Sequence, residues 1–306
     1  MSVGTNIARK AFVYGQSLVS RAGIMTVPNH YYAPIADVNE LKRTQASWAK
    51  RGSLHGIEID LDAQCDALRQ MVAPFQAEYR GNEPFLEGQA KGYGPGFGYI
   101  EAQCLHGLLR SLKPNQVIEI GSGVSTHCTA HALAHNAAEG HMSQITCVEP
   151  YPSAYLRTLP SIDLVERKVQ DVDLALFEAL EEGDLLFIDT SHAVKPGGDV
   201  LFIYLEIVPR LKPGVILQIH DIYLPYLYQR DLFDTVYQWS ETALLAALLM
   251  NNQRLSILFS LSMLHYDRPD VLRSVFPDYQ RAEDTLGLAN RSAPGHFPSS
   301  IYLQTA

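Results

Sequence analysis

Val117-Ile118-Glu119-Ile120-Gly121-Ser122-Gly123-Val124-Ser125-Thr126 is the stretch that decides the fold of this chain. A short apolar strand runs into a tight turn with two glycines, and a helix follows. Glycine lets the backbone approach a ligand closely, and the first turn of a helix presents free N–H groups. Thr126 stands where a dinucleotide-binding fingerprint needs its third glycine. The stretch predicts a strand–turn–helix ligand site that departs from the dinucleotide type.

Apolar strands alternate with helical segments on either side of this turn. We expect strands at 117–120, 145–148, 163–166, 185–188 and 215–219, with helices at 125–138, 174–180 and 200–211 between them. Further along, the pattern predicts a helix at 241–251 and strands at 255–261 and 300–303. Alternating strands and helices form a mostly parallel sheet covered on both faces. The fold class is therefore α/β.

Composition limits the kinds of partner. The 306 residues are 47% hydrophobic and 19% charged, which is ordinary for a globular protein with a large core. A net charge of −9 makes nucleic acid and membrane surfaces poor partners. The four cysteines include no C-x-x-C spacing, and the longest apolar run, 244–250, is too short to span a bilayer. We expect a cytoplasmic protein that acts on small molecules, and a homo-oligomer is compatible with this composition.

Acidic residues follow or end the first strands, where a ligand would bind. Glu119, two residues before the first glycine, is expected to face a cationic or hydroxyl-bearing ligand rather than a pyrophosphate. Glu149 ends the second strand and could accept hydrogen bonds from ribose hydroxyls, or be a solvated loop acid. Asp171 could bond an adenine amino group or cap a helix. S-adenosylmethionine (SAM) carries an ammonium, a sulfonium and a ribose without phosphate. We therefore expect SAM to contact Glu119, Gly121, Ser122, Gly123, Ser125, Thr126, Glu149, Asp171 and Asp189.

Four further motifs carry a resemblance to a known family. They are Asp184-Leu185-Leu186-Phe187-Ile188-Asp189-Thr190-Ser191-His192, Ile219-His220-Asp221-Ile222-Tyr223-Leu224-Pro225, Trp239-Ser240-Glu241 and Ser299-Ser300-Ile301-Tyr302-Leu303. With the glycine turn, they resemble bacterial class I SAM-dependent methyltransferases, distantly similar to macrocin and catechol O-methyltransferases. The resemblance implies a Rossmann-like, seven-stranded, mostly parallel sheet whose last strand is antiparallel. It places the SAM-binding domain at 85–306 and leaves 1–84 as an N-terminal cap or lid.

Asp189, His192, His220 and Asp221 are the candidate catalytic residues. They lie at the ends of two strands that the resemblance places side by side, so we expect them to converge beside the SAM methyl group. Asp189 and Asp221 could hold Mg²⁺ or another divalent cation, as the likeness to catechol-type enzymes implies. Those enzymes have Asp-Asn where this chain has His220-Asp221, so the ligand set would differ. A histidine acting as general base without metal is the alternative, and a purely structural role is a third.

The expected function is methylation of a small-molecule hydroxyl, such as that of a sugar or phenol. Two other readings stay open at this point: an NAD(P)-dependent oxidoreductase, and a SAM-binding module without catalysis. Thr126 and the late antiparallel strand argue against the oxidoreductase. Asp189 and the His220-Asp221 pair argue against the non-catalytic module.

Two segments stand outside this interpretation. His127, His131 and His135 recur every four residues and share one helical face, which we expect to be a solvated polar face rather than a zinc or nickel site. Tyr31, Tyr32, Trp48 and the glycine-rich loop 92–98 are candidates for a lid that covers the substrate.

Overall fold

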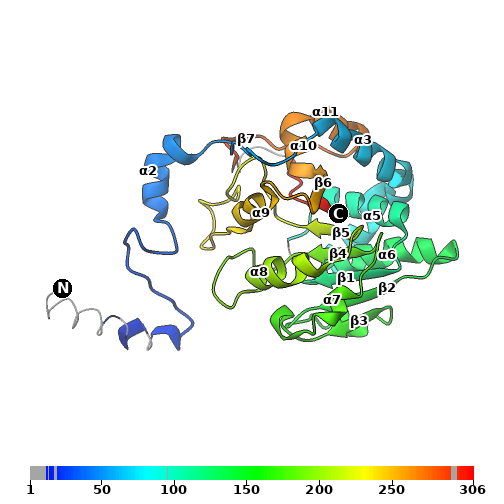
Figure 1. The fold of residues 1–306 in the computed structure, drawn as a ribbon, viewed down its shortest axis with the longest axis horizontal. Coiled ribbons are helices and arrows are strands. Elements are labelled where there is room, and N and C mark those ends of the chain that lie inside the picture. The colour runs from blue at the N-terminus through cyan, green and yellow to red at the C-terminus, as the bar shows by residue number, and fades with distance from the viewer. Residues whose placement is uncertain (1–11, 13, 17–18, 95, 291–294) are drawn as a thin grey trace. The chain divides into compact units, whose positions relative to one another are not determined.

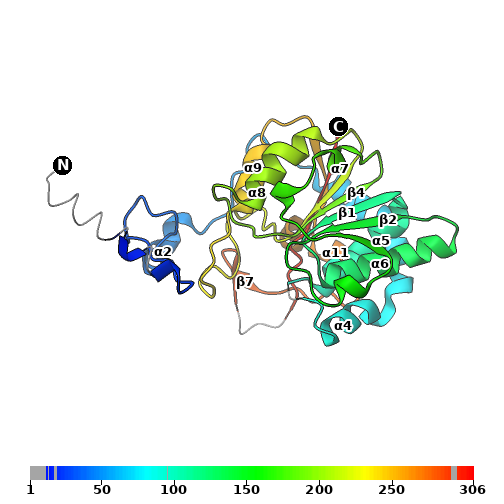
Figure 2. The ribbon, with the colours of Figure 1, turned by 90° about the horizontal axis from the view of Figure 1, so that it is seen from below.

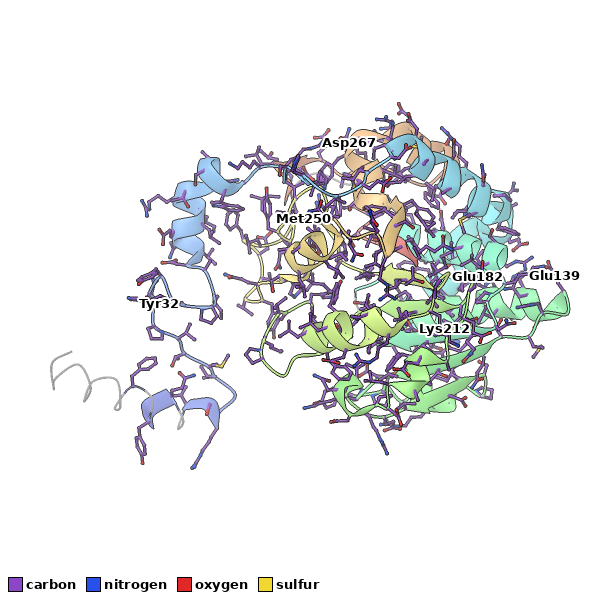
Figure 3. All side chains as sticks on the ribbon, in the orientation of Figure 1. Tyr32, Glu139, Glu182, Lys212, Met250 and Asp267 are labelled. Carbon is purple, nitrogen blue, oxygen red and sulfur yellow. The ribbon has the colours of Figure 1, made fainter. Side chains whose placement is uncertain are left out.

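The computed structural model describes residues 12, 14–16, 19–94, 96–290 and 295–306 (Figure 1). The chain divides into two compact units, Met1–Trp48 and Ala49–Ala306. In the first unit, helix α2 (Val38–Trp48) ends at Trp48, whose indole N–H donates to the carbonyl of Leu41 at 3.0 Å. Tyr32 of this unit, labelled in Figure 3, is 78% exposed. The role of this segment as a lid stays a prediction.

The second unit is built on a seven-stranded sheet with the order β3-β2-β1-β4-β5-β9-β6. The strands are β1 (Gln116–Ile120), β2 (Gln144–Val148), β3 (Ile162–Val165), β4 (Leu185–Ile188), β5 (Ile216–Ile219), β6 (Leu255–Ser260) and β9 (Ile301–Thr305). Strand β9 runs antiparallel to both of its neighbours, β5 and β6, and the other strands are parallel. The predicted mostly parallel sheet with an antiparallel last strand is confirmed.

Helices cover both faces of this sheet (Figure 2). The helices of the second unit are α3 (Leu61–Met71), α4 (Glu83–Ala90), α5 (Tyr99–Leu112), α6 (Val124–Ala138), α7 (Ala175–Glu178), α8 (Asp199–Phe202), α9 (Glu241–Leu249), α10 (Leu261–Asp267) and α11 (Pro269–Val275). Side chains of β1 alternate between the faces, since successive residues of a strand point in opposite directions. Val117 belongs to the core shared with α5 and α6, and Ile118 to the core shared with α8 and α9.

Short helical turns and a small hairpin complete this unit. They are η1 (Ala73–Asn82), η2 (Leu156–Thr158), η3 (Val169–Asp171), the π-helical η4 (Ile203–Ile207), η5 (Val208–Arg210), and the pair β7 (Asp284–Thr285) and β8 (Leu288–Ala289). Among the helices of the described residues, none combines the length and apolar character that crossing a bilayer requires.

Residues 49–84 are part of the second unit in the structure, whereas the sequence suggested a boundary at residue 84. Asp60 begins α3 by accepting hydrogen bonds from the backbone N–H groups of Asp62 and Ala63 at 3.0 and 2.9 Å. The helix then contacts β6 and α5, and Leu68 and Val72 are fully buried there. Burial of this apolar stripe gives the segment its place on the sheet.

Candidate active site

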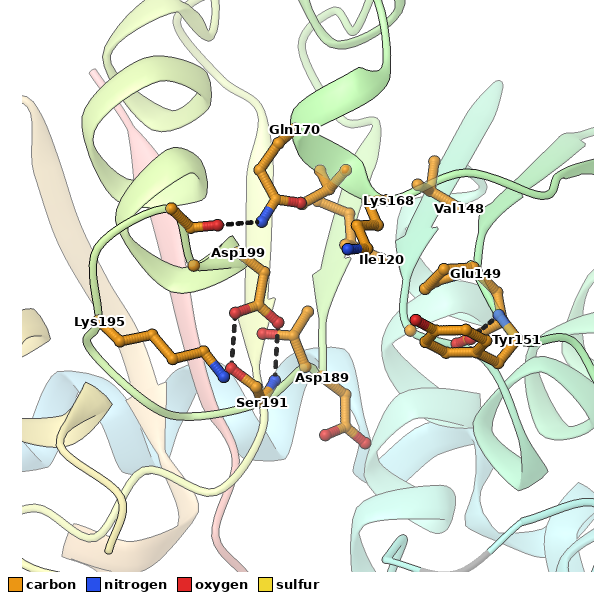
Figure 4. A pocket seen from close by; sticks show the side chains of 16 residues that line it. Ile120, Val148, Glu149, Tyr151, Lys168, Gln170, Asp189, Ser191, Lys195 and Asp199 are labelled. Atoms are coloured by element: carbon orange, nitrogen blue, oxygen red, sulfur yellow. Dashed lines mark hydrogen bonds between the residues drawn. The ribbon is translucent and has the colours of Figure 1, made fainter. Parts of the chain in front are cut away.

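A crevice opens at the carboxyl ends of β1, β2 and β4, where the order of the sheet reverses direction. Its larger part has a volume of about 420 Å³ and is lined by side chains that include Ile120, Val148, Glu149, Tyr151 and Asp189 (Figure 4). A smaller part of about 180 Å³ is lined by Phe97, Gly121, Ser122, Gly123, Val124, Ser125, Glu149 and Asp189. Ligands of open α/β sheets bind at such a reversal point. The glycine turn therefore lies where the sequence placed it.

Gly121 holds the turn against the end of β4. Its φ of +85° lies in the left-handed region, and a Cβ there would come within 1.8 Å of the Asp189 carbonyl oxygen. Its N–H donates to Val148 at 3.0 Å, while the N–H of Asp189 donates to Ile120 at 3.0 Å. The close approach requires glycine and brings Asp189 beside the glycine turn.

The first turn of α6 faces the smaller part of the crevice. Gly123 precedes the helix, and its N–H donates to the Thr126 hydroxyl at 3.1 Å. Ser122 and Ser125 line the crevice, whereas Thr126 is buried and contacts the turn through this hydrogen bond. The position of a third dinucleotide glycine is thus occupied by a residue that caps the helix. The first turn of this 15-residue helix presents backbone N–H groups at this end of the sheet, an arrangement that favours anionic groups.

Glu119 lies under the turn and is not among the described residues that line the crevice, and its contact with a ligand stays a prediction. Like Val117, it points to the α5–α6 face, because alternate residues of a strand share a face. It is 0% exposed, and its carboxyl accepts a hydrogen bond from the Ser125 hydroxyl. Burial raises its pKa to about 8. Through its hydrogen bond with Ser125, Glu119 holds the first turn of α6 against the end of β1.

Glu149 and Asp171 have different surroundings. Glu149 follows β2, lines both parts of the crevice, and accepts a hydrogen bond from the N–H of Tyr151 at 2.7 Å. Asp171 is exposed at the end of η3. Both Asp171 and its neighbour Gln170 are described by the structure, and of the two only Gln170 lines the crevice. The ribose contact of Glu149 and the adenine contact of Asp171 stay predictions.

Asp189, His192, His220 and Asp221 come together at the ends of β4 and β5. His192 Nε2 lies 3.2 Å from Asp189 Oδ1 and 3.6 Å from Asp221 Oδ2. His220 Nδ1 lies 3.6 Å from Asp189 Oδ2 and 3.5 Å from Asp221 Oδ2. Asp189, His220 and Asp221 can each offer an atom to a metal, and these three atoms lie within 4.8 Å of one another. The four candidates lie together in one cluster, as the strand order implied by the family resemblance required, and their position beside a SAM methyl group stays a prediction.

Two buried glutamates complete this cluster, and the sequence did not single them out. The Nδ1–H of His192 donates to Glu241 Oε2 at 2.8 Å, and Glu241 is 1% exposed. Glu101 of α5 is 3.9 Å from His220 Nε2 and accepts the backbone N–H of Ser299 at 2.8 Å. Glu241 lay within a motif that carried the family resemblance, whereas nothing in the sequence around Glu101 marked it.

The charges of the cluster stabilise one another. Burial would lower the pKa of His192, but hydrogen bonds to Asp189 and Glu241 outweigh it and raise the pKa to about 10. The pKa of His220 is likewise well above its usual value, despite burial, because of the charges of Asp221 and Asp189. Burial would raise the pKa of Asp189 and Asp221, but the charge of His220 holds both pKa values low. The two aspartates are therefore ionised at neutral pH.

Backbone strain is concentrated at the same place. His192 and Asp221 have φ values of +54° and +53°, in the left-handed region that non-glycine residues rarely adopt. The carbonyl of His192 accepts the N–H groups of Ser240 and Glu241 at 2.9 and 3.2 Å. Ser299 donates its hydroxyl to Asp221 Oδ1 at 2.9 Å. These bonds hold both strained residues in the orientation that aims their side chains into the cluster.

Comparison with known proteins agrees with this geometry. Residues 118–222 match the family described as "Methyltransferase domain". The match agrees with the resemblance to methyltransferases, and the matched segment contains the glycine turn, Glu149 and the Asp189–Asp221 cluster. An uncharacterised protein of Archaeoglobus fulgidus is 27% identical over 180 residues, which are 55% of this chain and 79% of the relative.

Two solved structures are also similar to this chain. The O-methyltransferase TomG from Streptomyces achromogenes, determined with SAM, is 13% identical, with 82% of this chain and 92% of that chain covered and a TM-score of 0.41. An O-methyltransferase from Bacillus cereus, determined with S-adenosylhomocysteine, is 11% identical, with 78% and 100% covered and a TM-score of 0.41.

Proposed function

We propose that this protein transfers a methyl group from SAM to a hydroxyl oxygen of a small molecule. The observation that carries the proposal is the position of Asp189. It lines both parts of the crevice beside the glycine turn, and it also contacts His192 and His220 of the charged cluster. A donor bound at the turn would therefore have its reactive carbon next to groups that can activate an acceptor.

The crevice has the polarity that SAM requires. The apolar side chains of Ile120 and Val148 suit the adenine ring, and Glu149 at the end of β2 suits the two ribose hydroxyls. The carboxylate of the methionine part would bind the N-terminus of α6, where Gly123 leaves the backbone accessible. Nothing in this arrangement requires a phosphate, and Thr126 occupies the position of the third dinucleotide glycine. These features favour SAM over NAD(P).

The cluster also suits a hard divalent cation. Asp189 and Asp221 are ionised, both ring nitrogens of the buried His220 have no hydrogen-bond partner, and the cluster contains more carboxylates than imidazoles. Asp189, Asp221 and His220 are the residues that would hold the ion, and His220 would release its proton when the ion binds, since only the neutral ring has a free lone pair. A cation such as Mg²⁺ would lower the pKa of the acceptor hydroxyl and orient its oxygen. This donor set differs from the Asp-Asn pattern of catechol-type enzymes.

His192 is the residue that we assign to proton removal. Glu241 fixes its Nδ1–H, so Nε2 points to the space between Asp189 and Asp221. A cation held by Asp189, Asp221 and His220 would supply positive charge that offsets the aspartates, and Nε2 of His192 would then take the hydroxyl proton. The transfer forms a bond between the acceptor oxygen and the methyl carbon and breaks the carbon–sulfur bond of SAM. The products are a methyl ether and S-adenosylhomocysteine, with the proton on His192.

Ligand binding tests the proposal without a known acceptor. SAM and S-adenosylhomocysteine should raise the melting temperature, whereas NAD should leave it unchanged, because only a ligand of the native state stabilises it. Stabilisation by NAD alone would exclude the methyltransferase function. A screen of sugars and phenols with labelled SAM would then identify the acceptor.

The cation is tested separately by calorimetry with Mn²⁺ on the protein saturated with S-adenosylhomocysteine. Asp221→Asn should weaken Mn²⁺ binding at least about tenfold and leave the affinity for S-adenosylhomocysteine unchanged. Asp66→Asn is the control, since Asp66 is an exposed acid paired with Arg69 on the surface of α3. Equal Mn²⁺ affinity in wild type and Asp221→Asn would contradict the metal assignment and leave the SAM assignment intact.

A further inference from the structure

Three histidines meet where α5 packs against α6. The ring centroid of His106 lies 5.7 Å from that of His131 and 5.6 Å from that of His135, and the last two are 4.9 Å apart. None of the three is among the described residues that line the crevice. The face of α6 that we expected to be solvated is thus partly buried against a third histidine.

His106 is prepared to act as a ligand. Its side chain is 0% exposed, and its Nε2 lies 3.1 Å from Glu78 Oε2. Because the carboxylate accepts the Nε2–H, the lone pair of the neutral ring is on Nδ1, and this buried nitrogen has no hydrogen-bond partner. Glu78 is held in turn by Arg110 at 2.7 Å. A carboxylate that fixes the tautomer from behind is the usual support of a metal-binding histidine.

His131 and His135 supply two more nitrogens from one face of α6. Their spacing of four residues is the one by which helices present two histidines to a single ion. The Nδ1 of His131 is also buried without a hydrogen-bond partner. Burial lowers the pKa of His106 to about 4 and lowers that of His131, so these rings are neutral at pH 7. Neutral imidazole is the form that binds metal.

The distances between the ring centroids, though not the present directions of the ring nitrogens, are compatible with a three-histidine site. With metal–nitrogen bonds of about 2.0–2.1 Å and tetrahedral angles, imidazole centroids lie roughly 5 Å apart. In the described residues, only Asp189, His220 and Asp221 already have ligand atoms within 4.8 Å of one another. The partly exposed rings of His131 and His135 would therefore have to turn toward Nδ1 of His106 for the three nitrogens to meet at one ion.

We propose that His106, His131 and His135 form a second metal site, which takes a nitrogen-preferring ion such as Zn²⁺, Ni²⁺ or Co²⁺. Its chemistry differs from that of the carboxylate-rich cluster, which suits a hard cation. The ion would join α5 to the helix whose first turn forms the cofactor site. This inference does not depend on the methyltransferase reaction.

His127 provides a matched control on the same helix. It lies one turn before His131, but its Nδ1 contacts the hydroxyl of Tyr155 and its Nε2 lies 3.3 Å from Glu87. It is therefore directed away from the three-histidine cluster. Alanine favours helix, so His127→Ala, His131→Ala and His135→Ala should all retain α6, which circular dichroism of the metal-free proteins would verify.

The experiment is a titration of the EDTA-treated full chain with Co²⁺ and Zn²⁺ in excess Mg²⁺, which is added to compete for the carboxylate cluster. Wild type should bind one Co²⁺ with the intense visible absorption of a tetrahedral nitrogen site, and Zn²⁺ should displace it. His131→Ala and His135→Ala should each weaken binding by about 100-fold or more, while His127→Ala stays within about twofold of wild type. The proposal is overturned if wild type shows no such absorption, if the two variants bind as wild type does, or if His127→Ala loses affinity equally.

Discussion

Replacing Gly121 by alanine tests the contact on which the whole site depends. The added Cβ would come within 1.8 Å of the Asp189 carbonyl oxygen, whereas real Cβ atoms stay at least 3.0 Å from such neighbours. The turn or the end of β4 must therefore move by more than about 1 Å, which close-packed interiors resist. That movement breaks the two backbone hydrogen bonds that join Gly121 to Val148 and Asp189 to Ile120.

The expected loss of stability follows from these terms. Two backbone hydrogen bonds contribute about 1 kcal/mol each, and the left-handed φ of alanine costs about 1 kcal/mol more. We expect the free energy of unfolding to fall by about 3 kcal/mol in urea titrations. Binding of S-adenosylhomocysteine, measured by calorimetry, should fall below detection because the displaced turn blocks the smaller part of the crevice.

Gly140→Ala is the matched control. Gly140 has a similar φ of +89°, but a Cβ there would meet no atom within 4 Å. It measures the backbone strain alone, so it should cost about 1 kcal/mol and leave ligand binding intact. If Gly121→Ala is no more destabilising than Gly140→Ala, or still binds S-adenosylhomocysteine normally, the close approach of the turn to β4 is refuted.

Two further variants test the buried carboxyls. The pKa of Glu119 is raised by burial from 4.5 to about 8, so the native state keeps this proton longer than the unfolded state. The stability that this group contributes is complete below pH 4.5 and is lost as pH rises toward 8. Glu119→Gln should therefore remove a slope of up to about 1.4 kcal/mol per pH unit from the free energy of unfolding in this range. Parallel plots of unfolding free energy against pH for wild type and variant would contradict this expectation. Glu241→Gln should lower kcat about 100-fold, measured with an acceptor from the screen, because His192 loses the carboxylate that orients it. SAM binding should stay unchanged. An unchanged kcat would show that Glu241 has no part in the mechanism.

The sequence predicted the elements whose signals are local. The apolar run of β1, the two glycines and the helix after them are contiguous, so their order and approximate bounds follow from pattern alone. The antiparallel position of β9 came from the family resemblance. Helices α10 and α11, which follow β6, were not predicted.

The parts that the sequence did not predict depend on contacts between distant residues. Glu241 meets His192 across 49 positions, and Glu101 meets Ser299 across 198. No periodicity or spacing reports such a contact, because it exists only after the sheet has formed. The direction of Glu119 is different: the alternation of side chains along β1 already places it with Val117, on the face opposite Ile118 and Ile120.

The place of β9 has a consequence for how the protein is made. This strand is synthesised last of the seven, yet in the described part of the chain it lies between β5 and β6 and joins them. The segment just before it supplies Ser299, which bonds both Asp221 and Glu101. A ribosome-bound chain that lacks residues 299–305 would expose the edges of β5 and β6 and would lack the bonds that hold Asp221. The charged cluster can therefore form completely only after β9, the last strand of this sheet to be synthesised, has inserted between β5 and β6.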